Sequence, residues 1–193
     1  MVSSARVDRL IANSRLVAWR IKHYWNRQAE VMPPPVATEY FTPGGDRGDA
    51  LLTVAALVPY KRVEVAIEVA KRLGRPLEIV GTGPRMPQLR RLAGPDVRFL
   101  GWLDRAELRD VYRRAAAVLV PNIEDFGMVT VEALACGTPV VMRPDHEAWD
   151  GANPDFPTLD GTYFSGGAGL SSTVAVSMPS VTAAALGTSA GSA

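Results

Sequence analysis

The chain has 193 residues, a formal net charge of +1 and one cysteine. This length suits one domain with an appendage rather than two Rossmann-like domains, and the charge gives no general reason to expect nucleic acid. Because Cys136 is the single cysteine of the sequence, an internal disulfide and a cysteine-based zinc site are excluded. Without a spanning apolar run or a secretory leader, we expect a cytoplasmic protein with no transmembrane segment.

The first segment, residues 1–35, is expected to form an inter-domain helix and a linker. Asn13 or Ser14 can cap the helix, and apolar residues recur after them at helical spacing. The three prolines at 33–35 forbid helix and impose an extended chain. Neither His23 nor His146 has a partner at ligand spacing, so we predict no metal site.

Residues 36–145 are predicted to alternate strands and helices. The predicted strands are 50–57, 77–80, 97–100, 116–120 and 139–142, and the predicted helices are 61–73, a segment ending at 92, one opened by Asp104 and Glu107 as a capping box, and 126–135. This repetition predicts a Rossmann-like α/β domain, a parallel sheet with helices on both faces. A ligand is then expected at the carboxyl edge of the strands. Basic residues in 85–91 and 105–114 are expected to be solvated helix faces.

Two turns of this domain carry candidate site residues. The turn after the first strand delivers Lys61 to a helix start, where it either meets an anion or is a surface charge. Gly81 and Gly83 follow the second strand. The third glycine of a dinucleotide fingerprint would fall on Met86, so an NAD site is disfavoured and a tight turn is the plain alternative.

The segment 124–141 is the most informative. Glu124 precedes a predicted helix, and Glu132 lies on that helix one turn below Met128. Unpaired amides over Phe126, Gly127 and Met128 suit a diphosphate, and a carboxylate can accept two ribose hydroxyls. The alternative is that Glu124 only caps the helix, whose positive end favours acids, and that Glu132 is a solvated helical side chain.

This segment resembles a known signature. Glu124 and Glu132 with seven residues between them, Phe126-Gly127, and the closing residues 135–141 look like family-four retaining glycosyltransferases of the GT-B fold. The Glu-Asp-Phe-Gly form most resembles bacterial mannosyltransferases of polysaccharide assembly. The chain therefore resembles the C-terminal, donor-binding domain of such an enzyme.

The resemblance implies a role for each candidate residue. Glu124 would lie against the donor hexose, Glu132 would hold the ribose, and the amides near Gly127 would take the diphosphate together with Lys61. The loop with Gly81 and Gly83 would lie close to the nucleotide.

Three features depart from that family. Ala56 stands where the family has an arginine that grips the diphosphate, and Arg62 is the candidate substitute. After Met142 the expected glycine pair and third acid are missing, and residues 146–193 are expected to be a disordered tail. The acceptor-binding half is absent from this sequence. One hypothesis for the unusual C-terminal stretch is a truncated or frame-shifted reading of a longer gene.

The resemblance implies transfer of a hexose, with mannose from GDP-mannose as the first expectation, to a hydroxyl acceptor with retention. The acceptor would be a glycan or a lipid-linked molecule held by a missing N-terminal domain, and peripheral membrane association stays open. Two alternatives remain. One is an inactive or truncated fragment that binds nucleotide sugar, and the other is an unrelated NAD-binding or protein-binding module.

Overall fold

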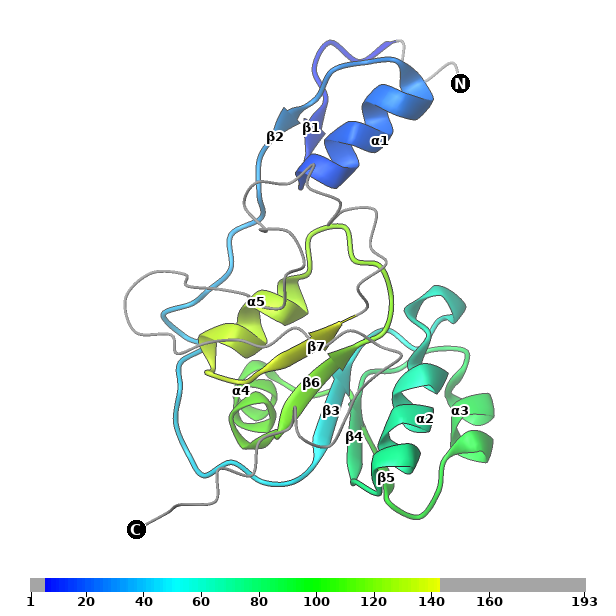
Figure 1. Ribbon diagram of the computed structural model, residues 1–193. Helices are drawn as coiled ribbons and strands as arrows, with labels where there is room; N and C mark the ends of the chain where they lie inside the picture. The colour runs from blue at the N-terminus through cyan, green and yellow to red at the C-terminus, as the bar shows by residue number, and fades with distance from the viewer. Residues whose placement is uncertain (1–5, 143–193) are drawn as a thin grey trace.

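The computed structural model describes residues 6–142 of the chain. Five parallel strands form the central sheet, in the order β5-β4-β3-β6-β7 (Figure 1). The strands are β3 (Leu51–Val54), β4 (Leu77–Val80), β5 (Val97–Gly101), β6 (Ala117–Val120) and β7 (Val140–Met142). Three expectations lie outside the described residues. They concern the tail 146–193, the departure of the sequence from the family pattern after Met142, and His146.

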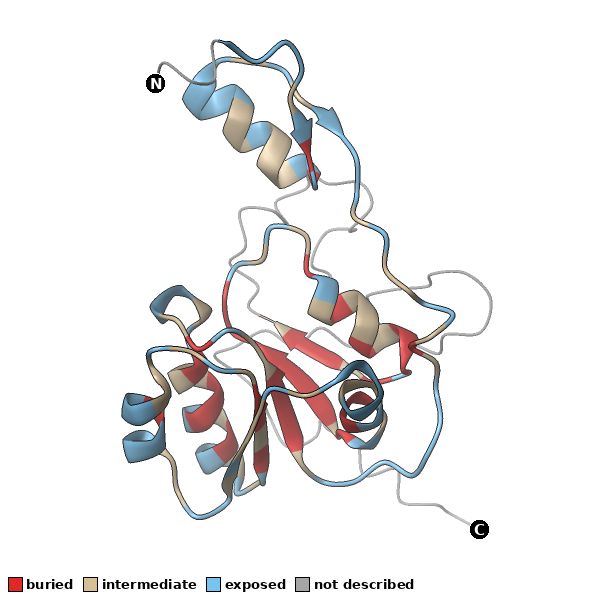
Figure 2. Ribbon diagram, turned by 180° about the vertical axis from the view of Figure 1, so that it is seen from behind, coloured by how far each residue is buried: buried red, intermediate tan, exposed pale blue. Residues whose placement is uncertain are grey.

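Helices cover both faces of this sheet, as the sequence predicted. One face carries α2 (Val63–Leu73) and α3 (Met86–Leu92), and the other carries α4 (Arg105–Arg114) and α5 (Met128–Ala135) (Figure 1). Consecutive strand residues point to opposite layers, so Leu51 packs with α2 and Leu52 packs with α4 and α5. Both faces of the strands are therefore buried (Figure 2).

The strand order reverses between β3 and β6. The chain moves outward from β3 through β4 to β5, and then crosses back to place β6 on the other side of β3. At such a reversal the loops after the two central strands diverge to opposite faces and leave a crevice at their carboxyl ends. The ligand site expected at this edge therefore has a defined place, between the loops that follow β3 and β6.

A smaller unit precedes the sheet. It consists of α1 (Arg15–Trp25) between β1 (Ile11–Ala12) and β2 (Glu30–Val31), which pair in parallel, and it stands apart from the sheet (Figure 1). The cap prediction is confirmed, because the Ser14 hydroxyl accepts from the Val17 amide at 3.2 Å. Strand β1 lies within residues 10–13, where the sequence offers the end of a strand, whereas β2 was missed, since a two-residue strand gives no periodic signal.

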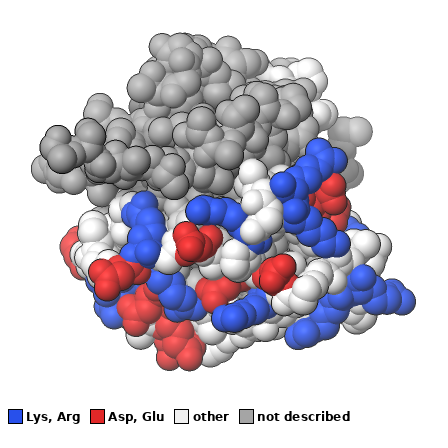
Figure 3. Space-filling model, turned by 60° about the horizontal axis from the view of Figure 1, so that its bottom comes forward, with Lys and Arg blue, Asp and Glu red and all other residues white. Residues whose placement is uncertain are grey.

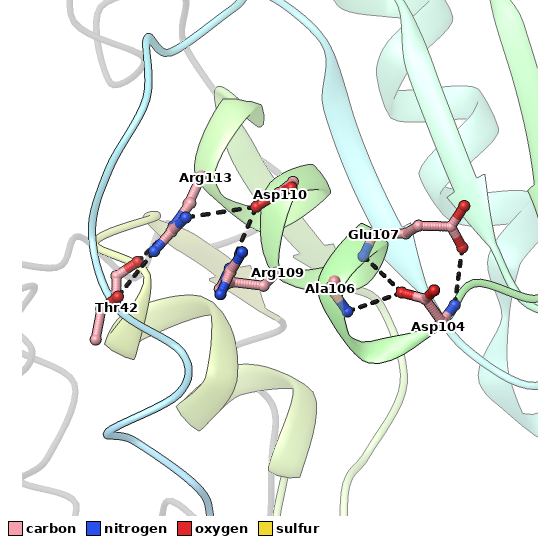
Figure 4. Close-up of polar contacts among 7 residues, drawn as sticks. All are labelled: Thr42, Asp104, Ala106, Glu107, Arg109, Asp110 and Arg113. Atoms are coloured by element: carbon pink, nitrogen blue, oxygen red, sulfur yellow. Dashed lines mark hydrogen bonds and ion pairs between the residues drawn. The ribbon is translucent and has the colours of Figure 1, made fainter.

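A strap of residues 40–42 joins that unit to the sheet. The guanidinium groups of Arg105 and Arg109 lie 4.6 and 5.0 Å from the ring centre of Tyr40. Arg113 donates to the Thr42 carbonyl at 2.7 Å and to its hydroxyl at 2.8 Å (Figure 4). The expectation that basic residues 105–114 are only a solvated face was therefore wrong, because these arginines hold the strap. The same close-up shows the predicted Asp104–Glu107 capping box, which is confirmed.

In the other basic segment, 85–91, Arg90 and Arg91 are exposed as expected, whereas the Arg85 side chain is only 19% exposed. On the face shown in Figure 3, basic and acidic residues are interspersed. Arg85 pairs with Glu64 at 3.3 Å, and Arg114 pairs with Glu78 at 2.9 Å. Within residues 6–142, no helix has both the length and the apolar character required to cross a membrane.

Candidate functional site

Lys61 and Glu124 meet across the strand reversal. Lys61 lies in the loop that follows β3, Glu124 lies in the loop that follows β6, and the Lys61 Nζ is 2.7 Å from the Glu124 Oε1. Their side chains are 16% and 20% exposed, so the pair is partly shielded from water but reachable. The structure thus brings together the two residues that were predicted as catalytic.

The backbone around Lys61 explains its position. Pro59 opens a single 3-10 turn, η2 (Pro59–Lys61), and the Arg62 amide donates to the Pro59 carbonyl at 3.2 Å. Arg62 has a φ of 50°, in the left-handed region, and α2 starts only at Val63. The prediction of one continuous helix over 61–73 was therefore wrong, because this residue breaks it. Arg62 itself is exposed.

Asn122 holds the Glu124 side chain from the other side. Its amide nitrogen donates to Glu124 Oε1 at 2.9 Å and to the Ile123 carbonyl at 2.9 Å, and the residue is 3% exposed. Sequence reasoning missed Asn122. The available signal was a polar residue placed two positions after the end of a buried strand that borders the reversal. The next residue of the loop, Asp125, pairs with Arg20 of α1.

The N-terminus of α5 opens beside Glu124. Gly127 has a φ of 87° and caps the helix without a side-chain hydrogen bond, so α5 begins at Met128 rather than at the predicted Phe126. Glycine suits this left-handed cap because it has no Cβ to clash. Met128 is 45% exposed, Phe126 is half-buried and Gly127 is buried. The first amides of a helix have no partner within the helix, and such amides are the donors that an anion site uses.

Glu132 faces α4. Its Oε2 accepts a hydrogen bond from the Tyr112 hydroxyl at 2.9 Å. Burial raises the pKa of the Glu132 carboxyl, while the Tyr112 hydrogen bond and the charge of Arg105 oppose that rise. Burial, followed by the Glu132 charge, raises the pKa of Tyr112, so its hydroxyl stays a donor. Glu132 is therefore not the solvated helical side chain of the alternative interpretation.

Gly81 and Gly83 lie where two backbones approach closely. A Cβ on Gly81 would stand 2.0 Å from the Ala55 carbonyl oxygen, and one on Gly83 would stand 2.5 Å from the Leu57 carbonyl oxygen. The Leu57 amide donates to the Thr82 carbonyl at 2.9 Å, which continues the β3–β4 pairing beyond the strands. These contacts account for both glycines as packing residues. Their predicted place near a nucleotide stays a prediction.

Comparison with known proteins identifies the family. A model described as "Glycosyl transferases group 1" matches residues 48–150, just over half of the chain. The chain belongs to this family. The D-inositol 3-phosphate glycosyltransferase of Kribbella flavida is 36% identical over 168 residues, covering 69% of this chain and 40% of the relative. The enzyme of the same name from Mycolicibacterium smegmatis is 33% identical over 163 residues, covering 69% and 37%. This group 1 glycosyltransferase chain thus spans about two fifths of the length of these relatives.

Solved structures show the same fold. A TarM variant from S. aureus, in complex with UDP among other ligands, has a TM-score of 0.63 at 16% identity and covers 74% of this chain and 31% of TarM. Anabaena HepE, in complex with UDP and glucose, has a TM-score of 0.63 at 19% identity and covers 74% and 46%. The GT-B fold of this group 1 glycosyltransferase is therefore confirmed. These relatives do not bear the name mannosyltransferase, so that expectation stays a prediction.

Proposed function

We propose that this chain is the donor-binding half of a glycosyltransferase, which binds a nucleoside diphosphate sugar and supports transfer of its hexose to a hydroxyl acceptor. One observation carries the proposal. A lysine and a glutamate from the two loops at the strand reversal meet at 2.7 Å, beside the glycine that caps the N-terminus of α5. A lysine and unpaired helix amides suit an anion, and a carboxylate suits the hydroxyls of a sugar.

Each group has a distinct task in this proposal. Lys61 and the amides of residues 126–128 stabilise the negative charge that develops on the diphosphate as the sugar departs. Glu124 orients the hexose, and Glu132 accepts from the ribose hydroxyls. Because Lys61 pairs with Glu124 at 2.7 Å, a diphosphate bound at Lys61 would compete with Glu124 for the ammonium group.

The nucleobase, sugar and acceptor are open to experiment. Two structural neighbours were solved with UDP, which makes UDP the first nucleotide to test, with GDP and GDP-mannose beside it. The relatives are named D-inositol 3-phosphate glycosyltransferases, so an inositol phosphate joins the glycan and lipid-linked hydroxyls as an acceptor to try. That acceptor would be bound by an N-terminal half. A cytoplasmic location and a reversible contact with the membrane surface belong to the same proposal.

Calorimetric titration tests the donor site. UDP, UDP-glucose, GDP, GDP-mannose and NAD are titrated into the chain and into its Glu132→Ala variant. We expect one of the two nucleoside diphosphates to bind and the variant to bind it at least about tenfold more weakly, because one charged hydrogen-bond acceptor is lost. Preferential binding of NAD, or no binding of either diphosphate, would contradict the proposal.

A second candidate function is nucleotide-sugar binding without transfer. It is favoured by Ala56, an exposed alanine in the loop after β3 where the resembling family has an arginine. Supplying an N-terminal half in trans and measuring sugar transfer separates the two. Binding without transfer would support the second candidate.

A further inference from the structure

Tyr112 is held by three different elements. Its side chain is fully buried, and its hydroxyl donates to Glu132 Oε2 at 2.9 Å. The Phe41 ring of the strap packs edge-on against it, with centroids 5.9 Å apart and planes at 74°. Its backbone carbonyl accepts from the buried Thr138 hydroxyl at 2.6 Å. The position of the Tyr112 hydroxyl is therefore fixed by contacts within the protein itself.

This hydroxyl restrains one of the two carboxylate oxygens of Glu132. A buried phenol needs a hydrogen-bond partner, and here the partner is a carboxylate at the border of the core. Within the described part of the chain, Oε1 of Glu132 has no hydrogen bond. A carboxylate held through one oxygen presents the other in a fixed direction, which lowers the entropic cost of binding a ligand.

The charges around Glu132 keep it an acceptor. Tyr112 and Arg105 approach it from α4, and the Cys136 thiol lies at the end of α5, the helix that carries Glu132. Tyr112 and Arg105 both lower the pKa of Glu132 and so counter the effect of burial. Loss of the tyrosine hydroxyl would leave burial less opposed, and the carboxyl would protonate at a higher pH.

We propose that Tyr112 is a positioning residue for the nucleotide: it holds Oε2 of Glu132 so that Oε1 is presented to the ribose hydroxyls of a nucleoside diphosphate. The inference rests on the proposed function. The inference adds Tyr112 to the proposed function. This residue does not touch the ligand, but it decides how well the site distinguishes a ribose from a deoxyribose.

Binding of UDP is compared with binding of 2′-deoxy-UDP and 3′-deoxy-UDP, with GDP and its deoxy forms used if GDP is the nucleotide that binds. Tyr112→Phe should weaken binding of the ribonucleotide about tenfold and that of the deoxynucleotides much less. The preference for ribose should therefore shrink. In a Glu132→Gln background, adding Tyr112→Phe should change each affinity less than about twofold, since the carboxylate that it orients is gone. Tyr24→Phe, which removes an exposed hydroxyl on α1, is the matched control and should change nothing.

A second readout is the pH dependence of binding. The acidic limb of the affinity profile should move to higher pH in Tyr112→Phe, because the hydrogen bond that favours the ionised carboxylate is lost. Equal weakening of ribo- and deoxynucleotides with an unmoved acidic limb would show a merely structural role and overturn the inference.

Two further outcomes are distinguishable. If the wild-type chain binds neither diphosphate, the proposed function fails and the inference fails with it, whereas binding with an unchanged ribose preference in Tyr112→Phe overturns the inference alone. If Tyr112→Phe does not fold, Glu132→Asp gives the answer. Its shorter side chain cannot reach Tyr112 and the ribose together, so it should lose the ribose preference while keeping its charge, and full retention would overturn the inference.

Discussion

Lys61 and Glu124, which are separated by 63 positions in the chain, form an ion pair of 2.7 Å where the strand order of the sheet reverses. The pair joins the loop after β3 to the loop after β6. A third residue, Asn122, holds the same carboxylate oxygen of Glu124 and fixes the geometry. The ion pair therefore marks the crevice in which a ligand of a doubly wound sheet is expected.

Replacing Lys61 by methionine should weaken binding of the nucleoside diphosphate by about ten- to a hundredfold, because a charge-assisted contact to phosphate is lost. The loss of folding stability should be modest, about 1–2 kcal/mol, since the pair is partly buried but Glu124 keeps its hydrogen bond from Asn122. Calorimetry measures the affinity and urea unfolding measures the stability.

Lys71→Met is the matched control for Lys61→Met. Lys71 lies near the end of α2, away from the carboxyl edge, and donates to the Leu92 carbonyl. Its replacement should leave nucleotide affinity unchanged. An equal loss of affinity in the two variants would show that Lys61 acts only through overall charge.

Glu132→Gln should raise the thermal midpoint more at pH 7 than at pH 4. Burial raises the pKa of Glu132 above its unfolded value, so the native state holds its proton more tightly. Stability from this group is thus greatest at low pH and falls as the pH rises through the native pKa. Glutamine does not ionise, so the variant does not lose folding stability in this way as the pH rises. Scanning calorimetry of the two proteins at both pH values checks the sign, and a gain confined to pH 4 would contradict it.

Gly81→Ala should destabilise the fold by about 3 kcal/mol or more, because the added Cβ would meet the Ala55 carbonyl oxygen at 2.0 Å and the residue has a φ of 127°. Gly94→Ala is the control, since its Cβ would meet only the Lys71 Cε, at 3.7 Å. Urea unfolding measures both. Equal stability of the two variants would mean that the two backbones can separate without cost.

Ala56→Arg should strengthen binding of the diphosphate up to about tenfold, since it adds a cation in the loop that carries Lys61. Ala93→Arg adds the same charge after α3 and should not strengthen binding. Titration of both variants with the same nucleotide makes the comparison. No gain for Ala56→Arg over the control would show that position 56 does not face the diphosphate.

Cys136 should resist thiol reagents while the protein is folded. Burial raises the pKa of its thiol to about 11, and the residue is 2% exposed. At pH 8 only about a thousandth of a thiol with this pKa is ionised, and the thiolate is the reactive form. Labelling should therefore follow unfolding in urea. Complete labelling of the native protein within minutes would contradict this.

Local patterns in the sequence predicted most of the sheet. The apolar run Leu77–Val80 is β4 as expected, and the Asp104–Glu107 capping box opens α4. The helix stop at the left-handed Gly74 was expected, but the left-handed break at Arg62 was missed. Arg62 is not a glycine, so nothing in its identity signals the φ of 50° that separates η2 from α2.

The candidate site was predictable only in part. Lys61, Glu124 and Glu132 follow from their spacing and from the family resemblance, and the structure places the first two in contact. The residues that hold the carboxylates, Asn122 and Tyr112, depend on contacts through space that the sequence does not show. Asn122 looks like an ordinary loop residue, and Tyr112 looks like an ordinary core residue of α4.

The strap sets a practical limit on how short a workable fragment can be. The family match begins at residue 48, but Phe41 is 2% exposed and packs against the Tyr112 ring. An expression clone that starts at residue 48 would remove that ring and leave an apolar hollow beside Tyr112, whose hydroxyl holds Glu132. Cloning boundaries for crystallisation or binding work on this half of the enzyme therefore belong upstream of Tyr40.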